Sequence, residues 1–171
     1  YNTLQTLDME ARKLNDDGRI SAVVGYVSDI LKYSLTNPQK SVSLREEMEF
    51  ASAYIFLLKM RFENNLQFDI QIGKSFEDYR LPPMAVQVLI ENAVKHNEIS
   101  DRKPLTIHIS TDSEGYLSVS NDIQPKWTAT PGTGIGLANL AKRYRLLFKQ
   151  DIQITEDKEF TVCIPLIDEV Q

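Results

Sequence analysis

The sequence predicts an α+β protein in which a helical segment precedes a two-layer α/β sandwich. The first observation is the helical spacing of apolar residues across the first third of the chain. The second is a set of short runs after residue 65 in which apolar and polar residues alternate, as they do in strands with one buried face. Helical stretches separate these runs, which indicates a largely antiparallel sheet with helices on one face.

The helical segment covers residues 1–64. Apolar residues between positions 20 and 35 follow i, i+3, i+4, i+7 spacing, and Pro38 ends this helix because the residue before a proline leaves the α region. The pattern from Ser43 to Glu46 fits a capping box and predicts a helix that runs to about Asn64. Residues 1–14 form a shorter helical pattern.

The sandwich covers residues 65–171. Its predicted strands are LQFDIQI (66–72), PLTIHIS (104–110), GYLSVSN (115–121) and DIQITEDKEFTVCIPL (151–166), the last a hairpin through Glu156 and Asp157. A loop from Gly73 to Pro83 precedes a helix that contains VLIENAVKHNE (88–98), and another helix is expected from about Gly134 to Phe148.

The composition of the chain limits the classes of protein to which it can belong. The chain is 42% hydrophobic and 25% charged, as in soluble globular proteins, and its net charge of -5 without a basic stripe argues against a nucleic-acid binder. No apolar run approaches the roughly 18 residues of a membrane span. Cys163 excludes an internal disulfide and is expected to be a buried thiol in a reducing compartment. Because the first residue is Tyr1 rather than Met, we expect a piece of a longer protein.

The helix at 88–96 combines apolar spacing with an unusual concentration of polar groups. Asn92 offers a neutral oxygen suited to a Mg²⁺ ion that keeps most of its waters and bridges nucleotide phosphates. Lys95 and His96, one turn further along, could neutralise phosphate oxygens. A solvated helix face is the ordinary alternative for this pattern.

The stretch PGTGIGLANL is a second candidate, because Gly132, Gly134 and Gly136 lead directly into a helix. Glycines allow close backbone approach, and a helix N-terminus attracts phosphate. The spacing is not that of a dinucleotide-binding fold, and Gly73-Lys74-Ser75 lacks the earlier glycine of a P-loop. Asn121 and Asp122 end a predicted strand, where an amide or carboxylate could contact a base edge. Together these features favour a nucleotide site.

LPPMAVQVLIENAVKHN resembles the N box of the GHKL (Bergerat) ATP-binding fold, and GTGIGL resembles its glycine-rich lid box. More narrowly, the chain is similar to the LytS-type (YehU-type) sensor histidine kinases, whose segment runs close to P-P-x-x-x-Q-x-L-x-E-N-A-x-K-H. The matching positions are Pro82, Pro83, Gln87, Leu89, Glu91, Asn92, Ala93, Lys95 and His96. Asn139 and Arg143 also match the C-terminal box of that family.

The resemblance implies the catalytic, ATP-binding part of a two-component sensor histidine kinase, which transfers the γ-phosphoryl group of Mg-ATP to a histidine. Asn92 would hold Mg²⁺, Glu91 would neighbour the metal or its water, and Lys95 and His96 would face phosphate. The residues that would close over the triphosphate are Gly132, Thr133, Gly134, Ile135, Gly136 and Leu137. The implied partners are a second copy, bound through the N-terminal helices, and a response regulator. The implied location is the cytoplasmic portion of a membrane-bound bacterial sensor.

Two departures from the family pattern stand out. Asn121-Asp122-Ile123 replaces the usual Asp-Asn-Gly, so either Asn121 contacts the base or the strand shifts and Asp122 does. The phosphorylated histidine would lie three residues before Tyr1, while His108 is expected to point to solvent. Two alternatives to a kinase remain open at this stage: a nucleotide-binding regulatory module without kinase activity, and a GHKL ATPase in which Glu91 serves as the base.

Overall fold

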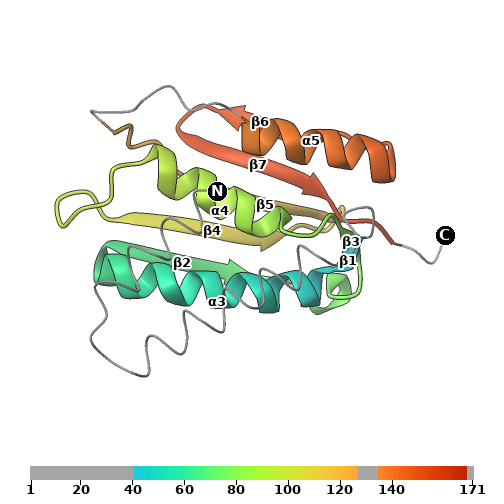
Figure 1. The fold of residues 1–171 in the computed structure, drawn as a ribbon, viewed down its shortest axis with the longest axis horizontal. Coiled ribbons are helices and arrows are strands. Elements are labelled where there is room, and N and C mark those ends of the chain that lie inside the picture. Colours follow the sequence, from blue (N-terminus) through green and yellow to red (C-terminus); the bar gives the residue numbers. More distant parts are fainter. Residues whose placement is uncertain (1–40, 127–134, 169–171) are drawn as a thin grey trace.

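The computed structural model describes residues 41–126 and 135–168, and the helices expected before residue 41 lie outside this range. Within it, three helices cover one face of a five-stranded sheet (Figure 1). The helices are α3 (Leu44–Phe62), α4 (Ala85–His96) and α5 (Ile135–Phe148). The strands are β2 (Leu66–Gln71), β4 (Leu105–Thr111), β5 (Tyr116–Asp122), β6 (Gln153–Glu156) and β7 (Glu159–Pro165). The predicted α+β sandwich is confirmed.

The strand order is β2-β4-β5-β7-β6, and most neighbours are antiparallel, as predicted. The exception is β2, which pairs parallel to β4 because α4 carries the chain back across the sheet between them. β6 and β7 form the expected hairpin. The short 3₁₀ turn η2 (Lys74–Phe76) confirms a turn at Gly-Lys-Ser.

A small second sheet, β1 (Val42–Ser43) with β3 (Arg80–Leu81), was not predicted. Its two-residue strands are too short to show an alternating pattern, so only pairing between distant segments reveals them. The capping box of α3 is confirmed. The Ser43 hydroxyl accepts from the Glu46 N–H at 3.2 Å, and the Glu46 carboxylate accepts from the Ser43 N–H at 2.8 Å.

One hydrophobic core fills the space between the helices and the sheet. Its fully or nearly fully buried members include Leu44, Ala51 and Leu58 of α3, Val86, Leu89, Ile90 and Ala93 of α4, and Leu105, Ile107, Ile109, Leu117 and Val119 of the central strands. Helix α3 therefore packs together with the sandwich, although the predicted boundary at residues 64 and 65 follows it. Ile70 was expected to be buried but is 43% exposed, because β2 is an edge strand and this residue lies at a groove beside α3.

The opposite face of the sheet is polar. His108 is exposed as predicted, and its Nδ1 lies 3.2 Å from a carboxylate oxygen of Asp69 on the neighbouring strand. Cys163 is half-buried on this face rather than fully buried, and partial burial raises the pKa of its thiol, with a further contribution from Asp112. A thiol with a raised pKa is a poor nucleophile at neutral pH, which agrees with the predicted structural role. Among the described helices, none is long and apolar enough to cross a lipid bilayer.

Candidate functional site

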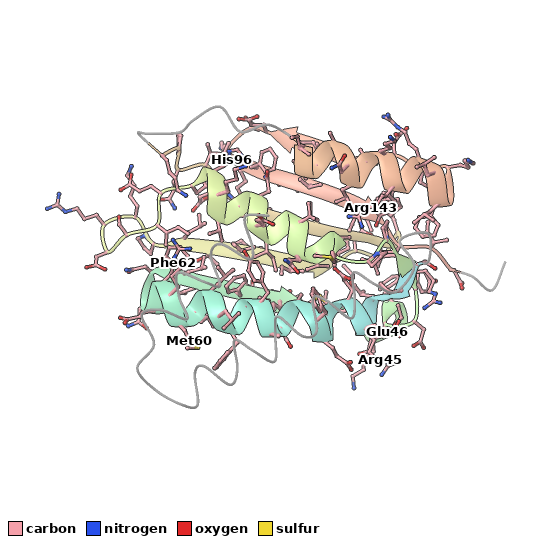
Figure 2. The ribbon with its side chains drawn as sticks, viewed as in Figure 1. Arg45, Glu46, Met60, Phe62, His96 and Arg143 are labelled. Atoms are coloured by element: carbon pink, nitrogen blue, oxygen red, sulfur yellow. The ribbon has the colours of Figure 1, made fainter. Side chains whose placement is uncertain are left out.

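Helix α4 has a buried side and an accessible side. Leu89, Ile90 and Ala93 face the core, whereas Asn92 is half-buried and Lys95 and His96 are exposed. Residues three and four apart lie on the same side of a helix, so Asn92, Lys95 and His96 share one accessible surface. Figure 2 shows His96 at the end of α4 that lies farthest from Arg143.

The start of α5 lies beside this accessible surface. A Cβ atom added to Gly136 would stand 3.6 Å from Cγ1 of Val88, which is ordinary contact distance, and Val88 is one turn before Asn92. Ile135 is 56% exposed and Leu137 is half-buried. The remaining predicted lid residues, Gly132, Thr133 and Gly134, lie outside the described residues. The asparagine-bearing helix and the last glycine of the predicted phosphate loop therefore meet in space.

A second contact fixes the direction of α5. Arg143 reaches from α5 toward the start of α4 (Figure 2) and donates a hydrogen bond to the carbonyl oxygen of Pro83 at 2.5 Å. Since Gly136 lies near Val88 and Arg143 near Pro83, α5 runs antiparallel to α4. The first turn of α5 thus lies beside Val88, one helical turn before Asn92.

The C-terminal end of α4 is fastened to the chain that follows β5. The Asn97 side chain, only 5% exposed, donates to the carbonyl of Ala93 at 2.8 Å and accepts from the Gln124 N–H at 2.7 Å. Two residues later Lys126 donates from Nζ to the carbonyl of Val94 at 3.0 Å. The segment before residue 127 is therefore held on α4 by hydrogen bonds, and the helix after residue 134 begins beside Val88.

Positive charge accumulates at this end of the helix. Partial burial lowers the pKa of His96 below its usual value, and the charges of Lys95 and Lys126 lower it further. Burial also lowers the pKa of Lys126, with a contribution from Arg61 at the end of α3. Cations near a helix C-terminus favour its dipole. Among the described residues, none forms an ion pair with Lys95, His96 or Lys126.

The two candidates at the end of β5 lie on opposite faces of the sheet. Asn121 is 2% exposed on the helix-covered face, and its amide donates to the Asp122 carbonyl at 2.7 Å. Asp122 is exposed on the polar face, because successive side chains of a strand alternate in direction. The structure therefore brings Asn121 to the side of the helices and leaves Asp122 away from the other predicted site residues.

Glu91 is half-buried and lies on the side of α4 toward α3. Burial raises the pKa of the Tyr54 phenol, the charge of Glu91 raises it further, and Arg61 opposes the shift. The Glu91 carboxylate is therefore close to Tyr54. Glu91 directly precedes Asn92 in the chain, so the two side chains leave the helix in directions that differ by about a quarter of a turn.

The oxygen donors on α4 suit a hard cation. Within the ranges that the structure describes, no cluster of three or more His, Cys, Asp or Glu side chains could enclose a metal by itself. Mg²⁺ is held in nucleotide sites by one or two protein oxygens together with phosphates and waters, rather than by a protein cage. Asn92, with Glu91 beside it, fits that mode of binding.

Comparison with known proteins assigns the family. A family model described as histidine kinase matches residues 1–66. The sensor histidine kinase BtsS of Escherichia coli is 29% identical over 158 residues, which are 91% of this chain and 28% of that protein. The sensor protein LytS of Streptococcus mutans is 30% identical over 173 residues, 92% of this chain and 29% of that protein. The chain belongs to the LytS, BtsS and YesM family of sensor histidine kinases.

A solved structure agrees in fold. The catalytic domain of the histidine kinase ThkA superposes with a TM-score of 0.50 at 19% identity, over 75% of this chain and 99% of that domain. The chain has the α+β fold of histidine kinase catalytic domains. It spans less than a third of the length of the curated relatives, for example 27% of the sensor histidine kinase YesM of Bacillus subtilis.

Sequence reasoning missed three residues of this kinase region that support the site. Glu47 of α3, Asn97 after α4 and Lys126 after β5 each join an element to the backbone of α4 or of the residues just before it. Asn97 is the last residue of the stretch that resembles the N box but is not one of its matching positions, so its place in that stretch was the only available signal. Nothing in the local pattern marks Glu47 or Lys126, because their partners are backbone atoms more than 30 residues away.

Proposed function

We propose that this kinase region binds Mg-ATP on the accessible surface of α4 beside the start of α5, and transfers the γ-phosphoryl group to a histidine. The observation that carries the proposal is the close approach of Gly136 to Val88, one helical turn from Asn92. It sets the first turn of α5, whose N–H groups favour phosphate, next to an amide oxygen suited to Mg²⁺.

Each residue has a defined task in this proposal. Asn92 holds the Mg²⁺ that bridges the phosphates, and Lys95 and His96 neutralise phosphate oxygens. The segment from Gly132 to Leu137 covers the triphosphate. Asn121 accepts a hydrogen bond from the base with a neutral amide oxygen, which weakens base selectivity relative to a carboxylate.

The transfer itself needs little covalent help from the protein. A neutral imidazole nitrogen attacks the γ-phosphorus, and the bond to the bridging oxygen breaks, so that this oxygen leaves with ADP. The imidazole releases the proton of its other ring nitrogen to solvent as the phosphorus–nitrogen bond forms. Positioning and charge stabilisation therefore supply most of the catalysis. The acceptor nitrogen comes from a histidine outside the nucleotide site.

Partners and location follow from the family. We propose that residues 1–64 mediate dimerisation and that residues 65–171 form the ATP-binding domain, with α3 packed onto that domain. A response regulator then accepts the phosphoryl group. The whole protein is a membrane-bound bacterial sensor, and this region is its cytoplasmic portion.

A nucleotide titration tests the proposal. Mg-ATP should bind the wild-type chain and lose about tenfold or more in affinity on Asn92→Ala, whereas Asn64→Ala at an exposed position should change nothing. The longer protein, with its upstream histidine, should then acquire acid-labile label from γ-labelled ATP. Tight binding with no labelled protein would favour a regulatory module. Steady phosphate release abolished by Glu91→Ala would favour an ATPase instead.

A further inference from the structure

Helix α4 begins without a cap of its own. Met84, at its N-cap, has φ = 63° and makes no side-chain capping hydrogen bond. The two preceding residues are Pro82 and Pro83, which have no N–H to donate. The Ala85 N–H donates to the Pro82 carbonyl at 3.3 Å, whereas the N–H groups of Met84 and Val86 depend on acceptors from elsewhere in the molecule.

Glu47 of α3 supplies those acceptors. Its Oε2 accepts from the Met84 N–H at 2.9 Å, and its Oε1 accepts from the Val86 N–H at 2.9 Å. The side chain is 0% exposed. Burying a carboxylate is costly unless it is well bonded, and here the positive end of the α4 dipole and two N–H donors offset that cost.

Helix α5 is attached at the same place. Arg143 donates to the Pro83 carbonyl, and the neighbouring Tyr144 is fully buried. Burial raises the pKa of the Tyr144 phenol, and the charge of Glu47 raises it further, so Glu47 and Tyr144 are close together. Both helices that flank α4 thus place an ionised side chain on the backbone of residues 83–86.

We propose that Glu47 is a positioning residue of the nucleotide site. Its two hydrogen bonds fix the axial and rotational position of α4, and this position determines where Asn92 lies, six residues and about 9 Å further along the helix. This inference rests on the proposed function, since it specifies how the same site is held in place. A cap that served stability alone would leave nucleotide affinity unchanged in a folded variant.

The test compares Glu47→Gln with Glu49→Gln, an exposed glutamate on the same helix. Glutamine keeps one accepting oxygen but loses the charge and the second acceptor. In chains shown to be folded by circular dichroism, Glu47→Gln should raise the Kd for Mg-ATP by about five- to tenfold. In the complete kinase it should raise KM more than it lowers kcat. Glu49→Gln should match the wild type in both measurements.

A measurement on the wild-type chain covers the case in which Glu47→Gln does not fold. The amide resonances of Met84 and Val86 should shift when a non-hydrolysable ATP analogue with Mg²⁺ saturates the chain, because coupling between the cap and the site is reciprocal. A folded Glu47→Gln variant with unchanged affinity overturns the proposal, as do unresponsive amides while Asn92 responds. Absence of nucleotide binding by the wild type is a different result, which overturns the proposed function as well.

Discussion

The two ends of α4 differ in charge, in burial and in the function that we propose for them. At the N-terminal end a buried carboxylate caps the helix, and two neighbouring helices converge on its backbone. At the C-terminal end Lys95 and His96 are exposed, and Lys126 adds a third basic group. The first end has its donors satisfied within the fold, whereas the basic groups at the second end form no ion pair with a residue that the structure describes. Substitutions at the first end should therefore reduce stability, and through it the position of α4, whereas substitutions at the second end should reduce ligand affinity alone.

Removal of the Glu47 side chain should give the largest effect. Glu47→Ala leaves the N–H groups of Met84 and Val86 without acceptors in a buried site, so the free energy of unfolding should fall by about 2–4 kcal/mol. Urea denaturation followed by circular dichroism measures this change. Glu49→Ala on the same helix should change stability by less than about 0.5 kcal/mol. If Glu47→Ala and Glu49→Ala lost similar amounts of stability, the buried Glu47 cap would contribute no more to the fold than an exposed glutamate does.

Lys95→Ala addresses the opposite end of α4. The Kd for Mg-ATP should rise about tenfold, because a charge-assisted contact with phosphate is lost. The free energy of unfolding should change by less than about 0.5 kcal/mol, because the side chain is exposed and forms no ion pair with a described residue. Lys74→Ala, at an exposed position in the turn η2, serves as the control for net charge. A large loss of stability with unchanged affinity for Mg-ATP would show that Lys95 stabilises the fold and does not bind the nucleotide.

His96 should make nucleotide affinity depend on pH. Its pKa lies below the ordinary value of 6.5 in the free chain, because burial and the charges of Lys95 and Lys126 disfavour the protonated form. Bound phosphate opposes that effect and raises the pKa, so binding takes up a proton and affinity increases as the pH falls toward 6. Over this pH range, we expect the affinity of the wild type for Mg-ATP to increase about two- to fivefold more than the affinity of His96→Gln does. The variant is the control for protonation of the nucleotide itself.

The lowered pKa of His96 also makes the stability of the nucleotide-free chain depend on pH. The unfolded state binds a proton on His96 more readily than the folded state does, so the contribution of this residue to stability is present above pH 6.5 and decreases below it. Thermal unfolding of the wild type and His96→Gln at pH 7.5 and pH 5.5 measures the difference. A wild type that loses no more stability than His96→Gln would contradict the lowered pKa.

Tyr144→Phe should give the smallest change. The Tyr144 hydroxyl is buried and has no hydrogen-bond partner among the described residues, although it lies close to Glu47. Removal of an unsatisfied buried hydroxyl should leave the free energy of unfolding unchanged or raise it by up to about 1 kcal/mol. Chemical denaturation is sufficient to measure this. A loss of more than about 1 kcal/mol would mean that the hydroxyl has a partner, such as an ordered water.

Most of the fold within the described residues followed from the sequence. The alternation in LTIHIS and LSVSN predicts strands with one buried face, and Ile107 and Ile109 are indeed buried while His108 between them is exposed. The capping box predicted the start of α3 at Leu44. Ile70 is an exception to this agreement. Its place in the alternation is correct, but its exposure depends on the position of β2 at the sheet edge, which no local pattern records.

The candidate site was predictable in part. The sequence marked Asn92, Lys95, His96 and the glycines before α5, because their residue types and spacing are local properties. Whether Asn121 or Asp122 faces the helices depends on strand register. The packing of the sheet decides this register, since a shift by one residue exchanges the two faces. In the observed register, the alternation of side chains along β5 puts Asn121 on the face covered by the helices.

By itself, the sequence determined the chemistry of α4, because a helical period of 3.6 residues places Asn92, Lys95 and His96 on one side regardless of the surroundings. Only the tertiary structure decided what stands at each end of that helix. Glu47 and Lys126 reach α4 from positions more than 30 residues distant in the chain, and Gly136 approaches Val88 across an even longer separation. The physical reason is that backbone N–H and carbonyl groups are the same in every residue, so sequence alone does not identify which distant side chain bonds to them.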